Sequence, residues 1–173
     1  MPKSFPAALP VASIVLRVLL ILNWIYGAIV LAILIGMLAA EQWTMTALGV
    51  PPSAETEPMI EGMRMIALLG LAGVPLNYIV LTRLLAMVHT VGAGDPFVAK
   101  NAERLQLIAW AVLGQQVLQL VIGLIAKSVS TPTHPLPISA FSTGGWLAVI
   151  LLFVLARAFT EGTRMRDDLA GTV

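Results

Sequence analysis

Residues 18–40, VLLILNWIYGAIVLAILIGMLAA, decide the fold because this run contains no Asp, Glu, Lys or Arg. A helix rises about 1.5 Å per residue, so the run is about 34 Å long and can cross a hydrocarbon core of about 30 Å. In the whole chain 58% of the residues are hydrophobic and 11% are charged, whereas a soluble domain has about 25% charged residues. The sequence therefore predicts an all-α membrane protein, with residues 8–17 as a helical extension in the interface.

Three more apolar runs follow, at residues 65–82, 105–126 and 138–156. Together with the first run they predict four transmembrane helices packed as a bundle, in a single domain of residues 1–173. Pro75 is expected to kink the second helix, which neighbouring helices tolerate. Residues 41–61 read as a loop, because Pro51 and Pro52 break a helix and several glutamates make the segment acidic.

The distribution of positive charge predicts the orientation. With the N-terminus inside, eight of the ten Lys and Arg residues are cytoplasmic, and only Arg64 and Lys127 lie outside. This positive-inside bias predicts cytoplasmic N- and C-termini and a multi-pass location in the bacterial inner membrane. Residues 91–104 then form a cytoplasmic loop, and residues 157–173 form a cytoplasmic C-terminal segment. That segment is predicted to be an amphipathic helical extension, whose apolar face carries Phe159, Gly162, Met165 and Leu169.

Nothing in the sequence resembles a catalytic site. The four apolar runs contain no Asp or Glu, and the HExxH, GxSxG and phosphate-binding Gly-rich motifs are missing, so we expect neither enzymatic activity nor a cofactor. Cys is absent, and His89 and His134 fall on opposite sides of the membrane in the predicted topology, which argues against a metal site. The net charge of +1 gives no indication of direct nucleic-acid binding.

Amide side chains are the main polar groups within the spans. They form a predicted intramembrane polar cluster of Asn23, Asn77, Gln115, Gln116 and Gln119. One interpretation is hydrogen bonding that holds the helices together, and the other is a polar substrate path. Asn23 and Asn77 are expected at a similar depth, either as an amide pair beside an aromatic belt or as a pocket that opens toward the cytoplasm. The aromatic residues expected at that depth are Trp24, Tyr78 and Trp110.

A ridge of small residues runs along the first span at four-residue intervals, through Ala28, Ala32, Gly36 and Ala40. Small residues let helix backbones approach closely, so this ridge is expected to face into the bundle. The same ridge would also suit contacts between two copies of the chain. Internal packing and homo-oligomerisation therefore both stay open.

Two motifs fall on the predicted cytoplasmic side: residues 94–105, GDPFVAKNAERL, and residues 157–173, RAFTEGTRMRDDLAGTV. Their pairing resembles the bacterial domain of unknown function 2975 family, a group of four-span inner-membrane proteins. No enzymatic activity is established for that family, so the resemblance implies none for this chain. The resemblance does imply an association with small helix-turn-helix regulators, and hence a role as a membrane partner or sensor for a cytoplasmic regulator.

The two motifs predict a surface for a cytoplasmic protein partner. Asp95 before Pro96 is a helix start, because the carboxylate caps free N–H groups and Pro fits the first turn. Arg164 or Arg166 is then placed to pair with acidic residues of the first motif, Asp95 or Glu103. The predicted partner-binding residues are Asp95, Phe97, Asn101, Arg104, Arg164, Arg166, Asp167 and Asp168.

Three functional hypotheses follow from these patterns. The first is a non-enzymatic interaction or regulatory module, whose partners are the lipid bilayer and a cytoplasmic protein. The second is a small oligomeric transporter or channel that uses the intramembrane Asn and Gln residues. The third is a subunit or assembly factor of a larger membrane complex. For each residue of the two cytoplasmic motifs, a purely structural role that closes the inner end of the bundle is the alternative to recognition.

Overall fold

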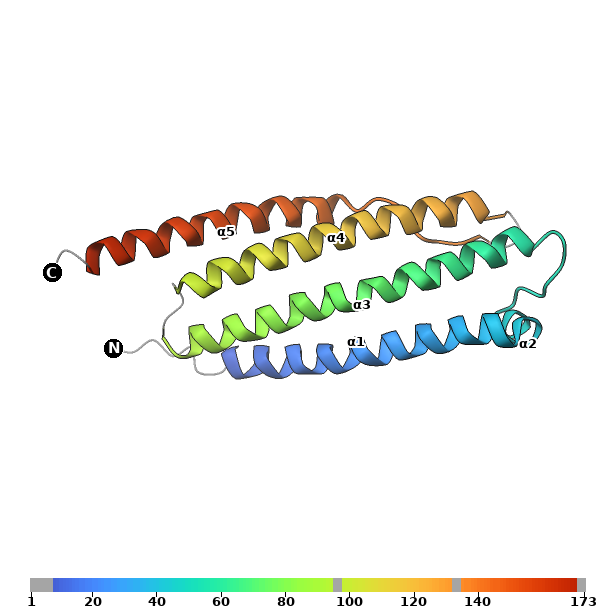
Figure 1. The fold of residues 1–173 in the computed structure, drawn as a ribbon, viewed down its shortest axis with the longest axis horizontal. Helices are drawn as coiled ribbons and strands as arrows, with labels where there is room; N and C mark the ends of the chain where they lie inside the picture. The colour runs from blue at the N-terminus through green and yellow to red at the C-terminus, as the bar shows by residue number, and fades with distance from the viewer. Residues whose placement is uncertain (1–7, 95–97, 132–134, 171–173) are drawn as a thin grey trace. The chain divides into compact units, whose positions relative to one another are not determined.

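The computed structural model describes residues 8–94, 98–131 and 135–170, and this part of the chain forms five helices (Figure 1). Four of them are long and apolar enough to cross a membrane, with mean hydropathies of 1.8 to 2.6 over their most apolar windows. The all-α class and the four spans are therefore confirmed. The five helices are α1 (Ala8–Ala39), α2 (Glu41–Ala47), α3 (Glu57–Gly92), α4 (Ala99–Val129) and α5 (Thr143–Ala170).

The helices contribute to two compact units. The first unit contains Met1–Leu22, Leu76–Gly114 and Thr143–Val173, which include the start of α1, the second half of α3, the first half of α4 and all of α5. The second unit contains Asn23–Pro75 and Gln115–Ser142, which include α2 and the remaining parts of α1, α3 and α4. Three helices thus belong to both units.

The core of the first unit is built mainly by α4. Leu105, Ile108 and Ala109 are buried along one face of this helix. A second contact joins α4 to α5, where the rings of Trp110 and Phe153 meet edge to face, with centroids 5.2 Å apart and planes at 85°. Aromatic pairs prefer this geometry because the positive edge of one ring meets the negative face of the other.

The second unit contains a core rich in methionine. Met37, Met45, Val50, Met59 and Ile60 are buried together, and three half-buried side chains pack against them: Ile33, Met63 and Leu136. Unbranched methionines fill irregular gaps, which suits a core formed where helix ends and loops meet.

The prediction of a loop over residues 41–61 is wrong at both ends of the segment. The first residues form α2, because EQWTMTA contains no Gly or Pro and buries Thr44 and Met45. At the other end α3 begins at Glu57, where the Thr56 carbonyl accepts a hydrogen bond from the Ile60 amide at 2.9 Å. Only the middle, around the two prolines, is irregular.

The last span also starts later than predicted. Residues 138–142 are not helical, and α5 begins at Thr143. Pro135 and Pro137 prevent a regular helix in the residues that come directly before this segment. The segment instead crosses the backbone of α4, since a Cβ added to Gly123 would lie 2.1 Å from Ala140 Cα. The helical extensions at residues 8–17 and 157–169 are confirmed as parts of α1 and α5.

The small-residue ridge faces inward only at Gly36, which is half-buried, and not along its whole length as expected. Ala28, Ala32 and Ala40 are exposed, whereas Asn23 and Gly27 are buried one helical turn apart. Other side chains approach the backbone of α1 closely at two glycines, since an added Cβ would lie 3.2 Å from Val74 Cγ2 at Gly27 and 2.8 Å from Thr44 Oγ1 at Gly36. These two glycines therefore matter more for the packing of α1 than the alanines of the ridge.

Candidate functional site

A groove lies between α4 and α5 in the first unit, and we call it the α4–α5 groove. Its volume is about 380 Å³. Two of its α4 residues are alanines and two of its α5 residues are threonines, so small side chains leave the space open. The lining residues are Ala99, Ala102, Glu103 and Gln106 of α4, with Thr160, Thr163 and Arg164 of α5.

The polar groups of the α4–α5 groove divide into two kinds. The Thr160 and Thr163 hydroxyls donate to carbonyls of their own helix, to Ala156 O at 2.9 Å and to Phe159 O at 2.7 Å. Glu103 and Arg164 are exposed and carry opposite charges on the two walls. Within the described residues no ion pair joins these two side chains. Both charges can therefore meet groups from outside the chain.

A hydrogen-bonded network lies next to the groove, between α3 and α4. Asn101 is 0% exposed, and its Nδ2 donates to Thr90 Oγ1 at 2.8 Å. Its Oδ1 accepts from Arg104 Nη1 at 2.8 Å, and the same Nη1 reaches Ala86 O at 3.2 Å. The Thr90 hydroxyl lies 2.8 Å from Met87 O, to which it can donate. Asn101 and Arg104 thus fasten the start of α4 to α3.

In the structure, some of the predicted partner-binding residues are buried and others are exposed. Asn101 is inside and Arg104 is half-buried, whereas Arg164 and Arg166 are exposed on α5. Asp95 and Phe97 lie outside the described residues, and so do the side chains of Asp167 and Asp168. The pairing that was expected for Asp95 lies outside the described residues as well.

Of the seven residues that line the α4–α5 groove, only Arg164 is among the predicted partner-binding residues. The other six are Ala99, Ala102, Glu103, Gln106, Thr160 and Thr163. A signal for them exists, because the four α4 positions are spaced i, i+3, i+4 and i+7, and the three α5 positions i, i+3 and i+4. Residues at these spacings share one face of a helix. The prediction selected mainly charged and polar residues of the two motifs, so it left out the small and uncharged side chains of the groove.

The predicted intramembrane polar cluster is also divided. Asn23 is 7% exposed, and its Nδ2 donates to Val74 O at 3.2 Å, directly before Pro75. Asn77 is exposed, and the three glutamines of α4 are half-buried: Gln115, Gln116 and Gln119. The aromatic residues that were expected beside the amides have exposed side chains: Trp24, Tyr78 and Trp110. For Asn23, the contact supports the packing interpretation over the pocket.

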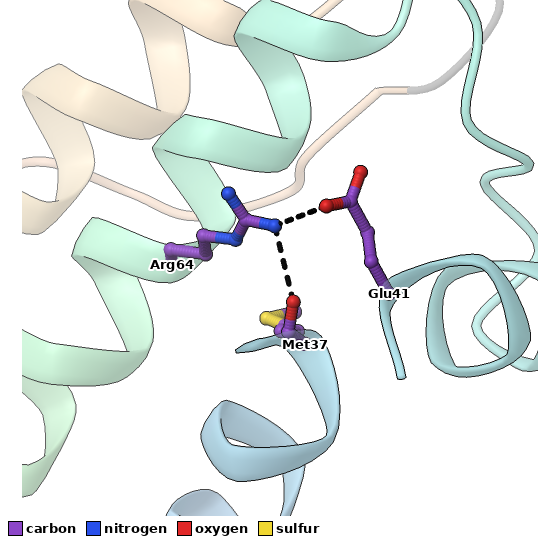
Figure 2. Close-up of polar contacts among 3 residues, drawn as sticks. All are labelled: Met37, Glu41 and Arg64. Atoms are coloured by element: carbon purple, nitrogen blue, oxygen red, sulfur yellow. Dashed lines mark hydrogen bonds and ion pairs between the residues drawn. The ribbon is translucent and has the colours of Figure 1, made fainter. Parts of the chain in front are cut away.

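A second polar site joins three helices in the second unit, as Figure 2 shows. Arg64 Nη2 of α3 donates to Met37 O, near the end of α1, at 3.0 Å. The same nitrogen lies 2.5 Å from Glu41 Oε2, at the first residue of α2. Orphan carbonyls at a helix C-terminus attract cationic side chains. Arg64 thus closes the turn between α1 and α2, a contact that no sequence motif indicates.

We expect the ion pair of Arg64 and Glu41 to make a small contribution to stability. Both side chains are partly exposed, and exposed pairs contribute about 0.2–1 kcal/mol. A double-mutant cycle with Glu41→Gln and Arg64→Gln, measured by unfolding in detergent, should give a coupling energy in this range. Arg64→Gln alone should cost more than Glu41→Gln, because it also removes the bond to the Met37 carbonyl. Equal costs for the two single variants would contradict this assignment.

Side chains that commonly bind metals are scattered in the part of the chain that the structure describes. No group of three or more His, Cys, Asp or Glu side chains lies together there.

Comparisons with known proteins place most of the chain in one family. A family model described as "Protein of unknown function (DUF2975)" matches residues 38–173. No curated protein and no solved structure matches.

Proposed function

The chain belongs to the DUF2975 family, and we propose that it is a non-enzymatic membrane protein that binds a protein partner at the α4–α5 groove. The observation that carries this proposal is the pair of exposed, opposite charges on the two walls, Glu103 and Arg164. A recess walled by small side chains accepts protruding side chains of a partner, and the two charges fix their orientation. Electrostatic complementarity of this kind confers specificity.

The positive-inside rule supports a cytoplasmic position for this groove. Arg164 lines the groove, and four more basic residues are close to its lining residues in the sequence of α4 and α5: Lys100, Arg104, Arg157 and Arg166. Lys and Arg accumulate in cytoplasmic segments of inner-membrane proteins. The partner is then a cytoplasmic protein, and a small helix-turn-helix regulator is the candidate that the family resemblance suggests.

The groove favours a partner segment of mixed charge. A basic side chain of the partner would meet Glu103, and a carboxylate would meet Arg164, as a pair on one helix face spaced i, i+4 would allow. An all-acidic or all-basic segment would face repulsion at one wall. We therefore propose a zwitterionic helix face as the recognised element.

Site-specific photocrosslinking in cells tests this proposal. A photoreactive residue at position 106 should capture one partner, whereas the same residue at the neighbouring position 107 should not, because Leu107 is exposed outside the groove. Arg164→Glu should reduce the yield at position 106 at least about fivefold, as expected for a loss of about 1 kcal/mol. The matched control is Arg157→Glu, which changes an exposed arginine of α5 that does not line the groove.

Two outcomes would contradict the proposal. One is an equal yield of the same partner at positions 106 and 107, and the other is a yield that Arg164→Glu leaves unchanged. The transporter hypothesis makes a different prediction, because it needs the half-buried glutamines of α4. Substrate-dependent flux in liposomes that Gln115→Leu abolishes, without a partner at position 106, would favour a transporter.

A further inference from the structure

The short helix α2 has one buried side and one exposed side. Thr44 and Met45 are buried and fix its inner face. Trp43 is 76% exposed, the highest exposure among the large hydrophobic side chains in the described part of the chain, and Leu48 after the helix is exposed too. Because α2 begins two residues after α1 ends, the chain's geometry keeps these side chains close to the end of a membrane span.

The end of a span lies at the boundary between hydrocarbon and headgroups. Trp concentrates there because its ring is apolar while its N–H needs a hydrogen-bond acceptor. An exposed Trp on a helix beside a span end therefore points to the lipid headgroup layer as its surroundings. A headgroup layer covers both faces of a bilayer, so α2 can lie in one on either side of the membrane.

A broad and open depression of about 550 Å³ lies on the surface of α2 beside Trp43, lined also by Ala40, Glu41, Gln42 and Thr46. Its charged group is the Glu41 carboxylate, of which one oxygen, Oε2, meets Arg64. Figure 2 shows the second carboxylate oxygen pointing away from Arg64. An aromatic face and a carboxylate oxygen together attract a cation, and quaternary or primary ammonium groups bind tryptophan faces in this way.

We propose that this open depression binds the ammonium group of a zwitterionic phospholipid, with α2 lying in the headgroup layer. The Trp43 ring contacts the ammonium group, and the outer oxygen of Glu41 accepts from it or stabilises its charge. An anionic phospholipid lacks this group and therefore lacks the contact with the Trp43 ring, while the ion pair with Arg64 balances the charge of Glu41. The site thereby distinguishes phosphatidylethanolamine from phosphatidylglycerol.

Native mass spectrometry of the full chain with equal amounts of the two lipids tests the preference. The wild type should retain more phosphatidylethanolamine than phosphatidylglycerol. Trp43→Leu should lower phosphatidylethanolamine binding about two- to fivefold, the factor that an exposed cation–π contact supplies, and should leave phosphatidylglycerol binding unchanged. Trp24→Leu is the matched control, since Trp24 is also exposed but lies inside the α1 span. Equal retention of both lipids by the wild type would overturn the proposal.

Fluorescence quenching tests the position of α2 without a disruptive substitution. The emission of Trp43 is obtained as the difference between the wild type and Trp43→Phe in vesicles of phosphatidylethanolamine and phosphatidylcholine. Lipids brominated near the headgroup should quench this emission more than lipids brominated near the chain ends. Stronger quenching by the deep label, or quenching by neither, would overturn the proposal.

Discussion

Gly123→Ala should destabilise the protein by about 2–3 kcal/mol, although alanine favours a helix by about 1 kcal/mol over glycine. The added Cβ would lie 2.1 Å from Ala140 Cα and 2.6 Å from Ala140 N. These are backbone atoms, which cannot rotate away as the end of a side chain can. The segment before α5 must therefore move off α4 as a whole. The measurement is the midpoint of unfolding of the purified variant in mixed micelles.

Two other glycines provide graded controls for this result. Gly144→Ala adds a Cβ that meets nothing within 4 Å, so it should be neutral or slightly stabilising. At Gly62 the added Cβ would lie 2.7 Å from Val129 Cγ2, a side-chain atom that can shift. Gly62→Ala should therefore fall between the other two variants. A cost for Gly123→Ala no larger than that for Gly62→Ala would contradict the close approach of the segment to α4.

The fold class could be predicted from the sequence because lipid imposes a single simple requirement. A charge-free run of sufficient length must be a helix in hydrocarbon, where every backbone group needs an internal partner. This requirement does not apply to the segments outside the spans. The segment EQWTMTA is too short and too polar to show a helical pattern, and it becomes α2 because Met45 joins the methionine-rich core. Tertiary packing, which a single sequence does not display, decides such elements.

The candidate site could be predicted only in part, for a related reason. The charges of α4 and α5 indicated which segments matter, and Arg164 does line the α4–α5 groove. Asn101 carries the same polar signal but is fully buried. A polar residue near the start of a helix can lie on the surface, or it can form a hydrogen bond to another helix. The register between two helices decides which one applies, and that register depends on the packing of side chains far along the chain.

Asn101→Leu should destabilise the protein by about 2–4 kcal/mol, because it leaves buried hydrogen-bonding groups without their partner. Leucine has a similar size but neither accepts from Arg104 Nη1 nor donates to Thr90 Oγ1. Of its bonds to the described residues, the charged guanidinium then retains the longer one, to Ala86 O. Removing one partner of a partly buried charge costs more than losing a neutral hydrogen bond. Unfolding of the purified variant in mixed micelles gives the cost directly.

Asn101→Asp keeps the shape of the side chain and changes its charge and its hydrogen-bonding groups. Aspartate keeps an acceptor for Arg104, now as a charge-assisted bond, and the Thr90 hydroxyl can donate to its second oxygen. We therefore expect a loss no greater than about half of that for Asn101→Leu. The double variant Asn101→Leu with Arg104→Met should cost less than the sum of the two single variants, since no charge is then left without its partner.

Photocrosslinking at position 106 should persist in Asn101→Asp if Asn101 only joins α4 to α3. Loss of that crosslink in a stably folded Asn101→Asp variant would instead give Asn101 a role in recognition.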